Sequence, residues 1–153
     1  MDNNLNHLRS YRLLPTVAAL AAVMFAGCSD GRPERVPVSG QVLIDGEPLK
    51  RGSVLFHAKD HRPAYGELGA DGNFQLSTYE LGDGCVLGAH AVSVDGAEVL
   101  NATSTRWHAP KKYRDAGNSG IVVNVDESMD PVQIQLSWDG GKPFIERVQG
   151  GGD

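Results

Sequence analysis

From Val36 onward, apolar and polar residues alternate along the chain with a period of two, which is the pattern of half-buried β-strands. In the first such segment, the valines and the isoleucine share one parity, while Ser39 and Gln41 take the other. The same pattern recurs along the chain, and it predicts a core built from these residues: Val36, Val38, Val42, Ile44, Val54, Phe56, Ala58, Phe74, Leu76, Val92, Val94, Ile121, Val123, Val125, Val132, Ile134, Leu136 and Trp138.

Turn residues separate these segments. Asp71-Gly72 is the strongest hairpin signal, because Asp-Gly tolerates the positive φ of tight turns. The pattern predicts about seven short strands and no helix after the leader, which favours an all-β, antiparallel sandwich in which two sheets each bury one face. We expect residues 96–120 to form a long irregular segment. We expect the glycine-rich tail 139–153 to fray, with a short edge strand around Phe144, Ile145 and Val148 as the alternative.

The N-terminal part has the features that are typical of an export signal. Arg9 and Arg12 precede an apolar run at residues 13–25, which is short of the roughly 20 residues that a membrane-spanning helix needs. Ala26 and Gly27 then provide small side chains before Cys28. The sequence Phe25-Ala26-Gly27-Cys28 resembles the bacterial lipobox, which implies lipidation of Cys28 and anchoring of the mature chain to a membrane. An ordinary secretory leader cleaved near Ala26 is the alternative.

These features divide the chain into four parts. Residues 1–27 are predicted to be a lipoprotein signal peptide, 28–37 a flexible tether, 38–138 a β-sandwich domain and 139–153 a glycine-rich tail. A domain of about 100 residues can bury a sufficient core without disulfides or metals.

Charge argues against a nucleic-acid-binding function, and cysteine content bears on the role of Cys85. The formal net charge is −5, and no basic patch indicates a nucleic-acid partner. Lipidation would consume Cys28, which leaves Cys85 without a pairing partner. We expect Cys85 to be a buried apolar side chain; a reactive thiol is the alternative.

The sequence contains no convincing catalytic or metal-binding constellation. His57 and His61 have zinc-like spacing but lie at a strand end and in a loop, without an evident third ligand. His90 shares the inward parity of Val92 and is expected at the edge of the core. The Asp-Gly pairs lack the arrangement of a calcium loop, and no Gly-x-Ser-x-Gly occurs. We therefore expect a protein that is not an enzyme and needs no metal or cofactor.

The segment 105–119 is the candidate recognition surface, because it concentrates aromatic residues and cations in an acidic domain. One interpretation is a contact surface for an envelope protein or a polysaccharide. The other is that the aromatic residues fold back as a lid over the open end of the sandwich, with the lysines in solvent. The speculative binding residues are Arg106, Trp107, Lys111, Lys112, Tyr113 and Arg114, with His108 beside them.

The order of several turn motifs resembles one protein family. Val38-Ser39-Gly40-Gln41-Val42, Asp45-Gly46-Glu47-Pro48-Leu49 and Gly52-Ser53-Val54-Leu55-Phe56 are similar to the opening of bacterial lipoproteins with a carboxypeptidase regulatory-like, or transthyretin-like, domain. Later motifs follow in the same order: Asp71-Gly72-Asn73-Phe74, Gly82-Asp83-Gly84, Lys111-Lys112-Tyr113 and Ser119-Gly120-Ile121. The resemblance covers residues 36–138.

The resemblance implies a seven-stranded, prealbumin-like or Ig-like Greek-key sandwich that is exported and lipid-anchored on the outer-membrane or periplasmic side. It implies no assigned activity. One related branch hydrolyses hydroxyisourate and ends in Tyr-Arg-Gly-Ser, whereas Tyr113-Arg114 is followed here by Asp115-Ala116. We therefore expect a non-catalytic binding or structural module of the envelope. A carbohydrate-binding domain that uses Trp107 and Tyr113 is the alternative, and a transthyretin-related hydrolase is a more distant one.

Overall fold

The computed structural model describes residues 31–148. The predicted signal peptide, Cys28 and the end of the tail lie outside these residues. The chain divides into two compact units, Met1–Arg32 and Pro33–Asp153, and the fold below is that of the second. Within the described residues, no helix is long and apolar enough to cross a membrane.

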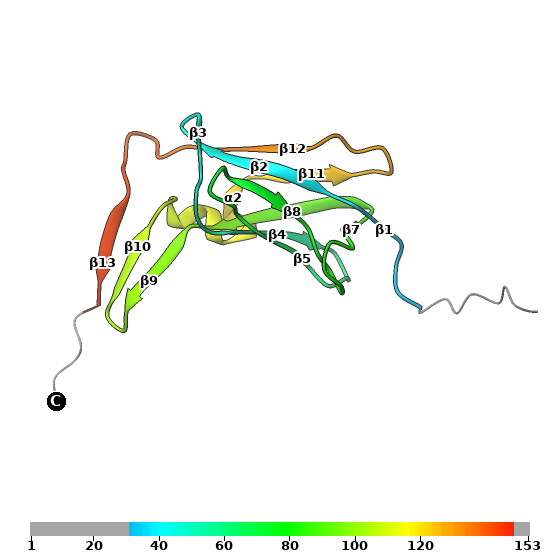
Figure 1. Ribbon diagram of the computed structural model, residues 1–153, viewed down its shortest axis with the longest axis horizontal. Coiled ribbons are helices and arrows are strands. Elements are labelled where there is room, and N and C mark those ends of the chain that lie inside the picture. Colours follow the sequence, from blue (N-terminus) through cyan, green and yellow to red (C-terminus); the bar gives the residue numbers. More distant parts are fainter. Residues whose placement is uncertain (1–30, 149–153) are drawn as a thin grey trace, which may run out of the picture. The chain divides into compact units, whose positions relative to one another are not determined.

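Two main sheets form the body of the domain (Figure 1). The first has the strand order β11-β8-β4-β5 and is antiparallel throughout. Its strands are β4 (Ser53–Ala58), β5 (Ala64–Glu67), β8 (Gly88–Asp95) and β11 (Val122–Val125). The second is built around β2 (Ser39–Ile44), which pairs with β3 (Glu47–Pro48), β6 (Asn73–Gln75) and β12 (Val132–Leu136). The prediction of an all-β fold is confirmed.

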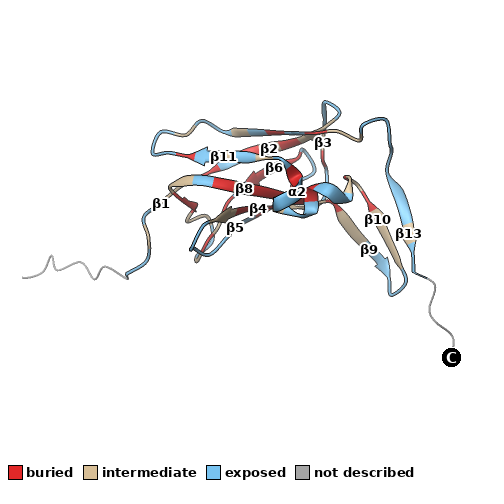
Figure 2. Ribbon diagram, turned by 180° about the vertical axis from the view of Figure 1, so that it is seen from behind, coloured by how far each residue is buried: buried red, intermediate tan, exposed pale blue. Residues whose placement is uncertain are grey.

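The inward-facing residues of both sheets form one core. Val54, Phe56, Val92 and Val94 of the first sheet belong to the same cluster as the apolar residues of β2, β6 and β12. Figure 2 shows these buried residues along β2, β4 and β8. Period-two alternation predicts this result, because successive side chains of a strand point to opposite faces of a sheet. The two sheets therefore have the character of a β-sandwich.

The pairing of β2 with β12 corrects one expectation. These strands run parallel, with Gly40 opposite Val132 and Ile44 opposite Leu136. The prediction that every strand pair is antiparallel is therefore wrong here. Alternation indicates which residues face the core but carries no information about strand direction.

A third, three-stranded sheet occupies the segments that were expected to be irregular. It consists of β9 (Ala97–Asn101), β10 (Ser104–Trp107) and β13 (Phe144–Arg147), all antiparallel in the order β13-β10-β9. We call this sheet the arm. The expected irregular segment at 96–120 is thus wrong over β9 and β10. The tail also forms the alternative edge strand at β13 instead of fraying there.

The arm and the first strand lie at opposite ends of the two main sheets, as both views show (Figures 1 and 2). At the end away from the arm, β1 (Arg35–Val36) pairs with β7 (Cys85–Val86). Gly84 allows this pairing, because a Cβ at its position would lie 1.9 Å from the carbonyl oxygen of Val36. The chain therefore enters the domain at one end and builds the arm at the other.

A short helical segment connects the arm to β11. It contains the 3₁₀-helix η2 (Lys111–Arg114) and the single-turn helix α2 (Ala116–Ser119). The Asp115 side chain caps α2 by accepting a hydrogen bond from the Gly117 amide, and Gly120 ends it with a φ of 70°. Tyr113 of η2 belongs to the core cluster, so this segment closes the core near the arm.

Candidate functional site

All four lysine and arginine side chains of the predicted recognition segment form ion pairs with acidic residues of the same domain. The acidic partners come from β8, β9, β13 and the loop after β12, so most of the pairs connect parts of the chain that are distant in sequence, whereas Arg106 and Glu98 lie in adjacent strands. The pairs are Arg106 with Glu98 at 3.3 Å, Lys111 with Glu146 at 2.5 Å, Lys112 with Asp139 at 2.6 Å and Arg114 with Asp95 at 3.0 Å.

Trp107 packs inside the arm instead of facing solvent. Its side chain is 5% exposed, and its ring stacks on Phe144 of β13 with the centroids 6.4 Å apart. The indole Nε1 donates a hydrogen bond of 3.0 Å to Oε2 of Glu146, and the Lys111 ammonium lies 4.9 Å from the centre of the indole ring. The hydrogen bonds from Lys111 and then Trp107 lower the pKa of Glu146 below its usual value. Trp107 therefore joins η2, β10 and β13.

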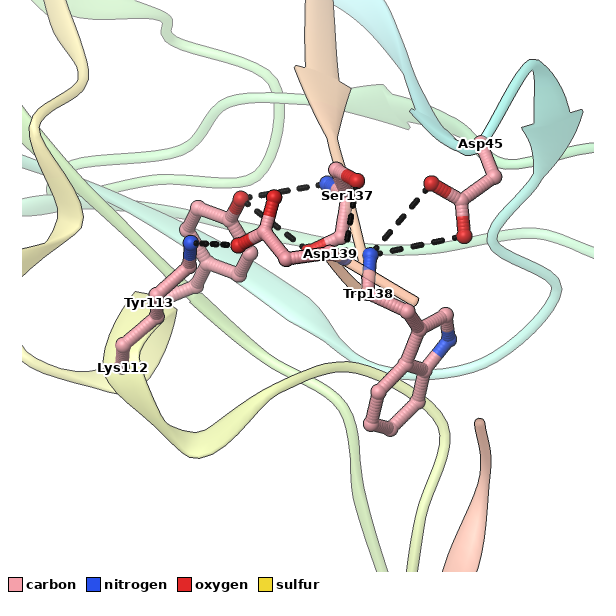
Figure 3. Close-up of polar contacts among 6 residues, drawn as sticks. All are labelled: Asp45, Lys112, Tyr113, Ser137, Trp138 and Asp139. Atoms are coloured by element: carbon pink, nitrogen blue, oxygen red, sulfur yellow. Dashed lines mark hydrogen bonds and ion pairs between the residues drawn. The ribbon is translucent and has the colours of Figure 1, made fainter. Parts of the chain in front are cut away.

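Tyr113 connects η2 to the end of β12 in the second main sheet, as Trp107 connects η2 to the arm (Figure 3). It is 7% exposed, and its hydroxyl accepts a hydrogen bond of 3.1 Å from the amide of Ser137. Beside it, the Lys112 ammonium donates to Asp139. This bond is the largest cause of both the raised pKa of Lys112 and the lowered pKa of Asp139. The chain just after β12 is thus fixed to η2.

These contacts decide between the two interpretations of the segment. The expectation that Trp107 and Tyr113 present their faces for recognition is wrong, because both are buried. The lid interpretation is confirmed for Tyr113, although Lys111 and Lys112 are engaged in ion pairs and not simply solvated. The burial leaves neither ring face open to the stacking contact of the carbohydrate-binding alternative. We call residues 106–114 the brace. They run from the end of β10 through η2, and their contacts connect the arm to the main sheets.

Glu98 of β9 is the acidic centre at the base of the arm, and the sequence analysis missed it. Its carboxylate lies 2.8 Å from Nε2 of His108, 3.2 Å from Arg51 and 3.3 Å from Arg106. The hydrogen bond with His108 is the largest cause of the lowered pKa of Glu98, followed by the nearby Arg51. Arg51 lies just before β4, so Glu98 links the arm to the first main sheet. No local motif marks Glu98 in the sequence.

A second polar cluster fixes the end of the domain where β1 lies. The guanidinium of Arg35 lies 3.0 Å from Asp83, and the side chains are only 17% and 14% exposed. Burial raises the pKa of Asp83, but hydrogen bonds from the amides of Thr78, Tyr79 and Glu80, together with the charge of Arg35, lower it below its usual value overall. This pair ties the start of the domain to the loop before β7.

The histidines and Cys85 form no catalytic centre within residues 31–148. His57 lies 2.9 Å from the hydroxyl of Ser93, but Ser93 is buried and no carboxylate within those residues contacts His57. No group of three metal-ligating side chains occurs among them either. His57 and His61, of which only the spacing is zinc-like, belong to no such group among the described residues.

Cys85 and His90 are both part of the buried interior, as predicted. Each is 1% exposed. His90 Nε2 lies 2.8 Å from the carbonyl oxygen of Val86, which requires this nitrogen to be the protonated one. Burial raises the pKa of the Cys85 thiol to about 11, so it is protonated at neutral pH and a poor nucleophile.

The arm carries most of the exposed apolar surface within residues 31–148. Five of the eight exposed large apolar side chains lie on or next to its strands, and β9 is an edge strand. The strand register places Val99 and Phe144 on the face of the arm that carries Trp107, and Ile145 on the opposite face beside Arg106 and Glu98, so the exposed side chains are divided between the two faces of the arm. Its five exposed residues are Val99, Leu100, Phe144, Ile145 and Val148.

Comparison of the chain with protein-family models, with curated proteins and with solved structures finds no match.

Proposed function

We propose that this chain is an exported, lipid-anchored module of the cell envelope that binds a protein partner through the arm and has no catalytic role. In this proposal Cys28 carries the lipid, and the two main sheets form the Greek-key sandwich of a transthyretin-like domain. The lipobox-like leader and the order of the turn motifs support this identity. The absence of an assembled catalytic cluster within residues 31–148 agrees with a binding role.

One observation carries the proposal: the arm exposes apolar side chains although ion pairs and a buried tryptophan connect it to the rest of the domain. Val99 is 75% exposed on β9, and Val148 is 66% exposed just after β13. The strand register places both on the face of the arm that carries Trp107. Ordering the arm has a large cost in conformational entropy, which the ion pairs of the brace and the buried Trp107 offset. A sheet that is held in this way, with its apolar side chains in solvent, suits a partner that covers it.

The free edge of β9 indicates the kind of partner. β9 pairs with β10 on one side only, so backbone N–H and C=O groups on the other side are available to an extended strand. Edge strands that resist such pairing carry lysine or proline, and Ala97–Asn101 contains neither. We therefore expect the partner to add a polypeptide strand to β9.

The position of the arm fits a membrane anchor at the other end. Seven peptide steps separate Cys28 from Arg35, which is a reach of about 25 Å at most. A lipid on Cys28 would hold the end with β1 near the membrane. The arm, at the end of the main sheets away from β1, would then be free for contact with other envelope components.

Two charge substitutions in the arm test the binding role. Val99→Asp and Val148→Asp together should dissociate a complex that is larger than the single chain in native electrophoresis of detergent-extracted membranes. Leu81→Asp is the matched control, because Leu81 is fully exposed and lies outside the arm. Migration of the unaltered protein as a single chain, or equal effects of Leu81→Asp, would contradict the proposal.

Fractionation of cells tests the anchor separately. Cys28→Ala should move the protein from the membrane pellet to the soluble envelope fraction, because several acyl chains together hold a domain at a bilayer. Cys28→Ser is a close steric match and should behave in the same way. Continued pelleting of both variants would show that another feature holds the protein at the membrane.

A further inference from the structure

The outer face of the second main sheet carries a row of carboxamides. The parallel pairing of β2 with β12 places Gln41 beside Gln133, and the antiparallel pairing of β2 with β6 places Gln41 beside Asn73. Three carboxamides from three neighbouring strands therefore share one face, at the strand spacing of about 4.8 Å. This row exists only because the parallel pairing sets these residues in register.

Further uncharged polar side chains enlarge the row to a patch. Ser39 lies opposite Gln75, two residues along the strands from the pair Gln41 and Asn73. Gln135 lies two residues after Gln133, on the same face of β12. All of these except the half-buried Gln41 are exposed. The patch thus differs from the base of the arm, where Glu98 and its cationic partners form ion pairs. We call these six residues the amide patch: Ser39, Gln41, Asn73, Gln75, Gln133 and Gln135.

A groove runs over part of the amide patch. It has a volume of about 450 Å³, which is within the range of small-ligand sites. Ser39, Gln41, Asn73 and Gln133 line it together with apolar atoms of Pro131 and Phe74, and no charged side chain does so. The groove therefore combines hydrogen-bonding groups with a small apolar surface.

Hydrogen bonds within the protein orient the carboxamides. Gln41 Nε2 donates to the carbonyl oxygen of Asp71 at 2.8 Å, which leaves its Oε1 as an acceptor. Gln135 Nε2 donates to Oε1 of Gln133 at 2.9 Å, which leaves Nε2 of Gln133 as a donor. Within residues 31–148, these remaining groups have no protein partner. The groove thus offers oriented donors and acceptors side by side.

We propose that this groove binds an uncharged saccharide. A sugar hydroxyl both donates and accepts hydrogen bonds, and a carboxamide provides both complements. The groove lining has no charged side chain, and the Asp71 carboxylate beside it already accepts hydrogen bonds from the backbone and side chain of Asn73, so hydrogen bonds and not a charge pair would hold the ligand. The strand spacing of about 4.8 Å and the spacing of about 7 Å between alternate residues of one strand match the size of one sugar ring. The site is separate from the arm and from Trp107, so it does not depend on the proposed protein contact.

Affinity electrophoresis of the full-length chain tests the site. The protein is extracted in a non-ionic detergent that has no sugar headgroup and is run through native gels containing dextran, galactomannan or hydroxyethylcellulose. Alginate serves as the anionic polysaccharide. At least one neutral polymer should retard the protein, and Gln41→Ala combined with Gln133→Ala should weaken the retardation roughly tenfold.

The control variant is Asn124→Ala, because Asn124 is an exposed carboxamide on β11 of the other main sheet. It should leave retardation unchanged. Thermal unfolding of all variants establishes that the fold is intact, and Gln133→Glu provides a second variant of nearly the same shape if the double variant is unstable. Retardation by alginate alone, by no polymer, or equally in all variants overturns the proposal. None of these results bears on the complex formed by the arm.

Discussion

The indole of Trp107 and the carboxylate of Glu146 are joined by a hydrogen bond of 3.0 Å, although 39 residues separate them in the chain. The same carboxylate accepts from Lys111 of η2. A single acidic side chain on β13 thereby holds both the neighbouring strand and the brace. The stability of the last strand depends on this contact, because most of the side chains of β13 are exposed.

Removal of this carboxylate should loosen β13 without unfolding the main sheets. In Glu146→Ala, Trp107 loses its acceptor and Lys111 its counter-charge, so the amides of β13 should exchange with deuterium roughly fivefold faster. The amides of β4 and β8 should keep their protection. Hydrogen–deuterium exchange with mass spectrometry measures both regions. Glu127→Ala is the matched control, because Glu127 is exposed in the loop between β11 and β12. Equal protection of β13 in both variants would contradict the role of Glu146 in holding this strand.

The carboxylate of Asp83 should make stability depend on acidity, because hydrogen bonds from the amides of Thr78, Tyr79 and Glu80, and to a lesser extent the charge of Arg35, favour its ionised form. Because the pKa of Asp83 in the folded state lies below its ordinary value, the stabilisation is complete above about pH 4 and is lost as the pH falls through the lower folded-state pKa. Asp83→Asn should lower the free energy of unfolding by about 2 kcal/mol at pH 7 and by less at pH 3. Urea unfolding between pH 3 and pH 7 measures this difference. Asp126→Asn, in an exposed turn, should show no such dependence, and a constant deficit for Asp83→Asn at all pH values would be inconsistent with this role of the Asp83 carboxylate.

Cys85 should be unreactive in the folded protein. Its burial and its pKa of about 11 leave almost no accessible thiolate at pH 8, so iodoacetamide should modify it only after unfolding in denaturant. Peptide mass spectrometry distinguishes its modification from that of Cys28. Rapid labelling of Cys85 in the native protein would indicate that the loop before β7 opens frequently.

The alternation of residue types predicted much of the core, although some predicted positions, such as Ile44 and Trp138, are only half-buried and others, such as Leu49 and Leu68, are buried outside the predicted set. Phe56, Leu76 and Val94 lie in the core as predicted, because burial of one face of a strand requires apolar residues at every second position. The strand direction of β12 was not predictable in this way, since parallel and antiparallel partners bury the same positions.

The arm and the brace were not predictable because their determinants are distant in the sequence. Thr105 and Arg106 of β10 give no clean alternation, since both faces of the arm are partly polar or exposed. The partners of the brace cations, such as Asp139 for Lys112, follow 27 or more residues later or precede them in other strands. The aromatic and cationic composition of 106–114 was therefore visible, whereas its engagement in intramolecular contacts was not.

Site-specific photocrosslinking in intact cells tests the role of the arm most directly. A photoreactive residue is placed in the full-length chain at Val99, at Val148 or, as the control, at Leu81. The account predicts a discrete adduct with one envelope protein from the two arm positions and none from Leu81, and it predicts that the adduct requires Cys28. No adduct from the arm positions, or the same adduct from Leu81, would contradict the claim that the arm is the contact surface of this domain.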